Sequence, residues 1–166
     1  MAITRTAQVD DDGSGTTGTI WNNAWKTELY NQIDANPAVQ TYTPTWGATG
    51  TAPVMGPSNT LNGWYTRTGS LVHFWIQFII QPGTSFGTGA WTFSLPNLYI
   101  AGSPLAITAT LNSAAGQQVA GASVYSSSYV FVYAAGAPNG ISGTVPFTWA
   151  AGDGVVISGA FFTLSA

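Results

Sequence analysis

The chain contains few residues that could do chemistry, and two of its short strings match motifs that enzymes use. Gly13–Gly18 spells G-x-G-x-x-G, which binds the pyrophosphate of a dinucleotide when a buried strand precedes it and a βαβ unit surrounds it. Three aspartates, Asp10, Asp11 and Asp12, precede this string and would repel a pyrophosphate, and no parallel strand is predicted after it. The context therefore favours a glycine-rich arm over a nucleotide site.

The second string is G-x-S-x-G at Gly83–Gly87, with Ser85 at its centre. A nucleophile elbow places this serine between a strand and a helix, with an acid and a histidine further along the chain. Here a strand pattern follows the serine, and the single histidine, His73, comes before it. We therefore predict a hairpin loop at this position.

Metal and cofactor sites also lack ligands in this sequence. The chain has no cysteine, which excludes disulfides, thiolate-bound zinc and a thiol nucleophile, and one histidine cannot make a histidine-based metal site. A calcium loop of the EF-hand type needs a glutamate at its twelfth position, and after Asp10 that position falls on Trp21. A solvated arm is favoured over a looser calcium site. We predict that the protein is not an enzyme and has no cofactor and no metal.

The distribution of charge bears on partners. Charged residues make up 5% of the chain, against about 25% in ordinary globular proteins. Residues 10–34 hold most of them, and the residues beyond hold only Arg67 and Asp153. Three cations in the whole chain cannot form a basic patch, and the most apolar stretch, Leu71–Ile80, is half the length of a membrane span, so we predict neither nucleic acid nor membrane as a partner. A nearly uncharged body favours a subunit packed against copies of itself or other proteins.

Two elements precede that body. Residues 1–19 are polar and glycine-rich, and predict an extended arm. Residues 20–36 predict a helix, since an apolar residue recurs every fourth position and Pro37 follows. The apolar stripe consists of Trp21, Trp25, Leu29 and Ile33.

Residues 37–166 change to a period of two and predict a single β-domain. We expect nine short strands at residues 42–46, 61–67, 71–80, 90–96, 105–111, 117–125, 128–134, 143–149 and 154–164. Glycine-rich turns separate them, which is typical of an antiparallel, jelly-roll-like β-sandwich. The fold class is therefore all-β, preceded by an arm and one short α-helix.

The aromatic residues allow two interpretations. They bury large areas in a core or a subunit interface, or an exposed subset forms a platform on which sugars stack. The residues concerned are Trp46, Trp64, Trp75, Trp91 and Trp149, with Tyr65, Tyr99 and Tyr125.

Three stretches of the chain carry a resemblance to a known class of proteins. They are "VDDDGSGTTGTIWNNAWKTELYNQID", "YTPTWGATGTAPVMGPSNTLNGWYTRTGSLVHFWIQF" and "GTGAWTFSLP", which include the patterns G-x-Y-x-R-x-G-x-x-V and W-x-F-x-L-P. Together they resemble structural proteins of tailed bacteriophages. The ending "GDGVVISGAFFTL" is similar in rhythm to the last strands of trimeric jelly rolls of the tumour-necrosis-factor type.

This resemblance implies a virion component that forms a homotrimer: a head fibre, a capsid decoration protein or a small tail-fibre subunit. On this reading, the arm anchors the protein to capsid or tail proteins. The helical stripe is an interface that packs either on symmetry mates or on the β-sandwich of its own subunit. The anchor residues are Ile3, Arg5, Asp10, Asp11 and Asp12. Arg67, His73 and Asp153 are the predicted subunit contacts, with an Arg67–Asp153 pair within or between subunits and three copies of His73 meeting on a trimer axis as hypotheses. The alternative is a module that binds carbohydrate or a host receptor, including a host surface glycan.

Overall fold

The computed structural model describes residue 29 and residues 38–97, 105–113, 116–125 and 128–163. The chain divides into two compact units, one of residues 1–38 with Ala166 and one of residues 39–165. The predicted arm and nearly all of the predicted helix lie outside the described residues. Leu29 has a helical backbone and a half-buried side chain.

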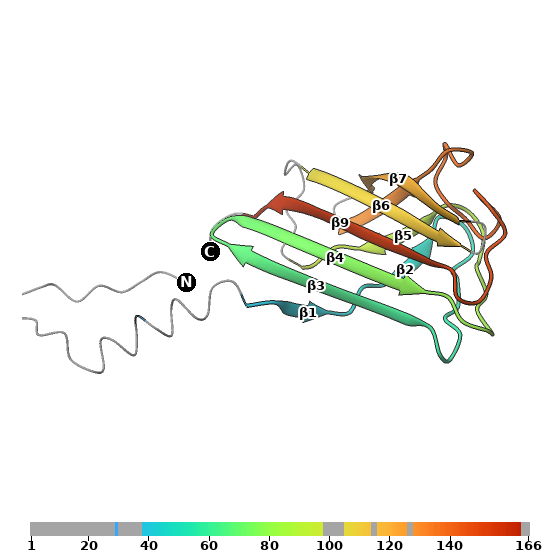
Figure 1. Ribbon diagram of the computed structural model, residues 1–166, viewed down its shortest axis with the longest axis horizontal. Coiled ribbons are helices and arrows are strands. Elements are labelled where there is room, and N and C mark those ends of the chain that lie inside the picture. Colours follow the sequence, from blue (N-terminus) through green and yellow to red (C-terminus); the bar gives the residue numbers. More distant parts are fainter. Residues whose placement is uncertain (1–28, 30–37, 98–104, 114–115, 126–127, 164–166) are drawn as a thin grey trace, which may run out of the picture. The chain divides into compact units, whose positions relative to one another are not determined.

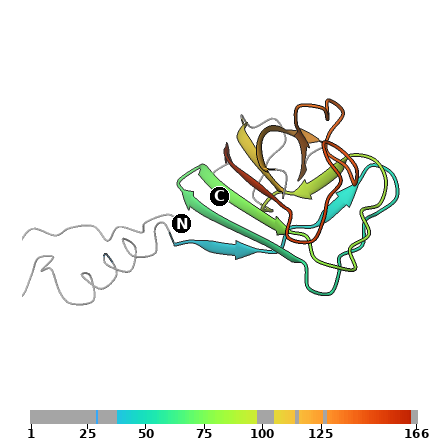
Figure 2. The ribbon, with the colours of Figure 1, turned by 45° about the vertical axis from the view of Figure 1, so that its right-hand side comes forward.

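The second unit is built from β-strands that pair only antiparallel among the described residues. The strands are β1 (Gln40–Tyr42), β2 (Trp46–Ala48), β3 (Thr60–Thr68), β4 (Leu71–Ile79), β5 (Trp91–Ser94), β6 (Leu105–Ser113), β7 (Gly116–Tyr125), β8 (Tyr129–Tyr133) and β9 (Gly154–Phe162). Their order in the sheet is β1-β3-β4-β9-β6-β7-β8-β5-β2. Figures 1 and 2 show this sheet curling, so that β5 and β2 come round behind β3 and β4. The prediction of an all-β, antiparallel fold is confirmed.

Alternation along β4 decides which side of the sheet faces the core. Val72, Ile76 and Phe78 are fully buried, whereas His73 and Trp75 between them are exposed. Successive side chains of a strand point to opposite faces, so one face of β4 lies inside the curl and the other lies outside it. Residues 71–79 therefore show the period of two that the sequence predicts.

The core fills the inside of the curl and joins strands that are distant in the sheet order. Phe78 on β4 lies 6.3 Å from Trp91 and 5.9 Å from Phe93 on β5, measured between ring centroids. Trp91 also contacts Trp149, whose ring centroid is 4.9 Å away in the long connection between β8 and β9. These aromatic side chains therefore hold the two arms of the curled sheet together.

The structure corrects the single strand predicted at residues 42–46. β1 and β2 flank this segment and lie at opposite edges of the sheet, β1 beside β3 and β2 beside β5. Pro44 is buried between them and has no backbone N–H for a continuous ladder. Ser94 of β5 secures the crossing, because its hydroxyl accepts a hydrogen bond from the Thr45 N–H at 2.8 Å.

The strand predicted at residues 143–149 is also wrong. This segment forms a turn, in which the backbones of Ser142 and Val145 form an isolated antiparallel bridge. Pro146 follows directly and cannot donate to a ladder. The Trp149 indole N–H instead donates to the Ser142 carbonyl at 2.7 Å, which closes the segment on itself.

Candidate binding and assembly face

The outward side chains of β4, β9 and β6 form a surface that we call the outer face. It consists of Leu71, His73, Trp75, Gln77, Thr108, Val156, Ser158, Ala160 and Phe162. Each of these side chains is half-buried or exposed, and none carries a formal charge at pH 7 with His73 neutral. The outer face is therefore an uncharged, partly apolar surface on a rigid, hydrogen-bonded support.

Large and small side chains alternate on the outer face. Trp75 and Phe162 protrude, with 40% and 51% of their surface exposed. Between them lies a shallow hollow of about 320 Å³, which His73 and Phe74 of β4 line together with small residues of β9 and β6. Ser158 faces Thr108 across the hollow, with their hydroxyl oxygens 3.3 Å apart. The face thus presents both knobs and a hollow, which a flat polar surface would lack.

The structure separates the tryptophans that the sequence grouped together. Trp91 and Trp149 are buried and donate their indole N–H groups to backbone carbonyls, and Trp46 is half-buried against the core. Trp64 and Trp75 instead lie on the outward side of β3 and β4, directly opposite one another. Their rings stack with centroids 4.9 Å apart and planes at 28°. Trp75 is exposed and Trp64 is half-buried.

The tyrosines of that group contribute less. Tyr65 is half-buried and meets Tyr42 edge-to-face at 6.1 Å. Tyr99 and the side chain of Tyr125 lie outside the described residues.

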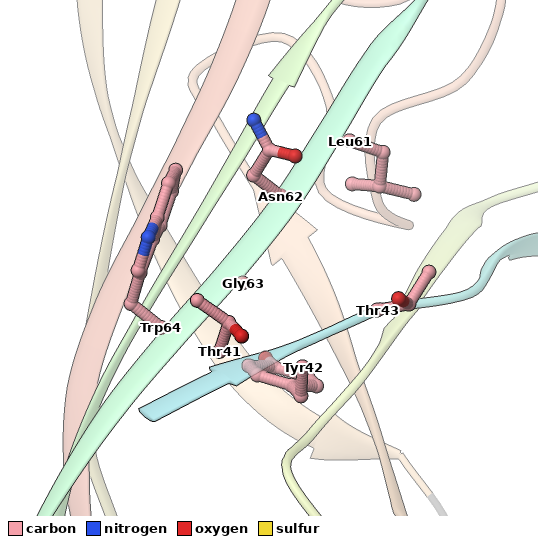
Figure 3. A pocket seen from close by; sticks show the side chains of 7 residues that line it. All are labelled: Thr41, Tyr42, Thr43, Leu61, Asn62, Gly63 and Trp64. Carbon is pink, nitrogen blue, oxygen red and sulfur yellow. The ribbon is translucent and has the colours of Figure 1, made fainter. Parts of the chain in front are cut away.

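A cleft of about 370 Å³ lies beside Trp64, where β1 ends and β3 continues. β1 pairs with Gly63–Tyr65, whereas Thr60–Asn62 pair with β4 on one side and with no strand of the described residues on the other. Figure 3 shows the lining side chains, which come from β1, from the residue after it and from β3. They are Thr41, Tyr42, Thr43, Leu61, Asn62, Gly63 and Trp64.

The floor of this cleft depends on a glycine. Gly63 lies opposite Tyr42 in the β1–β3 register, and a Cβ at Gly63 would clash with the Tyr42 ring. The ring therefore covers the bare glycine, an arrangement that stabilises glycine in antiparallel sheets. Burial raises the pKa of the Tyr42 hydroxyl, which lies 3.4 Å from the Ser94 carbonyl oxygen that accepts its hydrogen bond.

Among the predicted subunit contacts, only His73 lies on the outer face. Arg67 sits at the end of β3, opposite Val72 of β4, and donates from Nε to the Gly69 carbonyl at 2.8 Å. Asp153 is buried at the other end of β4, where its carbonyl accepts the Ile80 N–H. The backbones of Arg67 and Asp153 therefore lie near opposite ends of β4, which at ~3.3 Å per residue is about 25 Å long. The structure does not bring Arg67 and Asp153 together within one subunit, and a pair between subunits stays a hypothesis.

Asp153 also has a structural role in its own turn, separate from the predicted subunit contact. Its carboxylate accepts the Ala150 N–H at 2.7 Å, and its own N–H donates to the Ala150 carbonyl at 3.1 Å. It thereby closes the turn that leads into β9. An aspartate in a glycine-containing turn is the sequence signal for this role.

The other residues that the sequence analysis considered do not form a second candidate site among the described residues. Ser85 lies in a loop whose backbone bridges to Val54, and not at a strand-to-helix turn. The described residues contain no cluster of three or more histidine or acidic side chains that would hold a metal ion, and no helix among them is long and apolar enough to cross a membrane. The predicted anchor residues and most of the helical stripe lie outside the described part of the chain.

Comparisons with protein-family models, curated proteins and solved structures found no match for this chain.

Proposed function

We propose that the protein is a non-enzymatic structural subunit of a tailed-phage virion, and that it assembles as a homotrimer through its outer face. The observation that carries the assembly is the uncharged outer face, with Trp75 and Phe162 protruding beside a shallow hollow. A knob from one copy fits the hollow of another without desolvating a charge, and the buried apolar area stabilises the contact. The virion assignment rests on the resemblance of the sequence to phage structural proteins.

The proposal also assigns the strands to two layers. We regard the curled sheet as a jelly-roll-like sandwich, with β3, β4, β9 and β6 in one layer and β5 and β8 in the other. The contacts of Phe78 with Trp91 and Phe93 across the core support two packed layers. In this arrangement the outer face belongs wholly to the first layer, so three copies pack sheet against sheet around an axis near His73.

The oligomeric state tests the assembly directly. Size exclusion with light scattering should give about three times the 17.3 kDa chain mass. Replacing Ala160 by arginine places an unpaired charge at the hollow, and an unpaired charge buried in an interface costs several kcal/mol. We expect Ala160→Arg to be monomeric at concentrations where the wild type is trimeric.

Ala135→Arg is the matched control, because Ala135 is an exposed turn residue away from the outer face. It should remain trimeric. A monomeric wild type, or an Ala160→Arg variant that assembles like the control, would contradict assembly through this face.

A further inference from the structure

The cleft between β1 and β3 lies beside the outer face but differs from it in chemistry. Its rim carries the hydroxyls of Thr41 and Thr43, the amide of Asn62 and the indole of Trp64. Its volume, about 370 Å³, falls within the range of about 300–1,000 Å³ that is typical of small-molecule sites. No charged side chain lines it. A ligand here meets one aromatic surface and several uncharged hydrogen-bonding groups.

The indole of Trp64 is held in a fixed orientation. Trp75 stacks on it at 4.9 Å, and both residues are anchored opposite each other in the β3–β4 ladder. Figure 3 shows the Trp64 ring edge-on, with Asn62 and Thr41 to the same side of it. A rigid ring costs little conformational entropy when a ligand stacks on it, so the pair forms a ready-made platform beside the polar groups.

The polar groups complement that platform. Asn62 offers two N–H donors and a carbonyl acceptor, and each threonine hydroxyl both donates and accepts. All three side chains are exposed. A pyranose ring has a face of C–H groups and a rim of hydroxyls, and the face stacks on an indole while the rim hydroxyls bond to amide and hydroxyl side chains. The absence of a cation in the lining gives an anionic group no partner.

We propose that the β1–β3 cleft binds a neutral sugar, with Trp64 as the stacking surface and Asn62, Thr41 and Thr43 as the hydrogen-bonding residues. The site lies at the margin of the outer face and does not depend on the proposed trimer. It goes beyond the structural role, because it gives the subunit a ligand of its own.

Isothermal titration calorimetry of the full chain provides the test. The probes are methyl glucoside, methyl galactoside, methyl mannoside and N-acetylglucosamine, with lactose and sialyllactose as a neutral and an anionic pair. We expect at least one neutral probe to bind and sialyllactose to bind no more tightly than lactose. Binding of none of the neutral probes, or a clear preference for sialyllactose, overturns the proposal.

Two cleft variants locate the site, and a third serves as a control. Asn62→Ala should weaken binding of the best neutral probe by about tenfold, the loss of one hydrogen bond. Trp64→Phe should weaken it by reducing the stacking surface. Asn139→Ala removes another exposed amide, outside the cleft, and should bind as the wild type does. Equal binding by Asn62→Ala, Asn139→Ala and wild type refutes the site.

Light scattering on the same samples separates this proposal from the assembly. A trimer that binds no neutral probe leaves the proposed function standing and removes the sugar site. A monomer whose sugar binding depends on Asn62 leaves the sugar site standing and removes the trimeric assembly.

Discussion

At the residue scale, the pairing of Gly63 with Tyr42 shows how one small residue shapes the cleft. The Tyr42 ring occupies the space that a side chain at position 63 would need. It also packs on Tyr65 and reaches Ser94 on β5. A change at Gly63 therefore affects both the cleft floor and the crossing between the two sheet edges.

We predict that Gly63→Ala destabilises the protein by about 1–3 kcal/mol, the usual cost of forcing extra volume into a packed site. Urea unfolding followed by tryptophan fluorescence measures this change. Gly121→Ala is the control, because Gly121 also lies in a strand but a Cβ there meets nothing within 4 Å. The account of the Tyr42 ring fails if the two variants unfold at the same urea concentration.

The five tryptophans between residues 46 and 149 show where prediction from single residues stops. The sequence includes Trp64 and Trp75 among the candidates, and it does not distinguish them from Trp91 and Trp149. A tryptophan suits a pleated surface equally well on either face, and only the register of β3 with β4 decides which face it takes. The cleft has no sequence signal at all, because it arises where β1 stops and β3 continues.

At the element scale, β9 places two adjacent phenylalanines in opposite environments. Phe161 is fully buried and packs against Phe74, with ring centroids 5.9 Å apart, whereas Phe162 is exposed on the outer face. Because successive side chains of β9 point to opposite faces, one phenylalanine contributes to stability and the other to assembly. One residue holds the sheet to its core, and its neighbour holds one subunit to the next in the proposed trimer.

We predict that Phe161→Ala lowers the free energy of unfolding by about 3–5 kcal/mol, as is usual for a buried phenylalanine. Phe162→Ala should leave the far-ultraviolet circular dichroism spectrum unchanged and shift the monomer–trimer equilibrium towards monomer. Denaturant titration measures the first change, and light scattering over a dilution series measures the second. A Phe162→Ala variant that dissociates no more readily than wild type removes that residue from the interface.

Periodicity predicts individual strands well and their arrangement poorly. The alternating pattern of residues 71–80 predicts β4 and its buried face, because every second side chain of a strand points the same way. The split at Pro44 and the turn at residues 142–145 depend on which distant strands accept the backbone. Local propensity carries no such information, so both segments resemble ordinary strands in the sequence.

At the scale of the whole molecule, charge is unevenly divided between the two units of the chain. In the described residues, Asp153 is the only acid and Arg67 the only side chain that is always cationic. The remaining charged residues all fall within residues 1–34. In the proposed function, the nearly uncharged unit packs on other copies of itself, and the charged segment meets a different protein on the particle.

Deleting residues 1–18 separates these two roles. We predict that the shortened chain keeps the trimeric mass and no longer sediments with virions that lack the native protein. Light scattering and a co-sedimentation assay measure the two properties on one preparation. If the shortened chain still sediments with the particles, residues 1–18 are not the anchor.

The central place of β9 affects how the sheet is completed during folding. Before β9 pairs, the strand order contains two separate ribbons, β1-β3-β4 and β6-β7-β8-β5-β2, with open edges on β4 and β6. Both edges stay open until β9 pairs, and β9 is the last strand in the sequence, which slows completion of the sheet. An open slot between two apolar ribbons accepts any strand of matching pattern. A neighbouring copy carries such a strand in its own β9, so strand exchange between nascent subunits would begin at this slot.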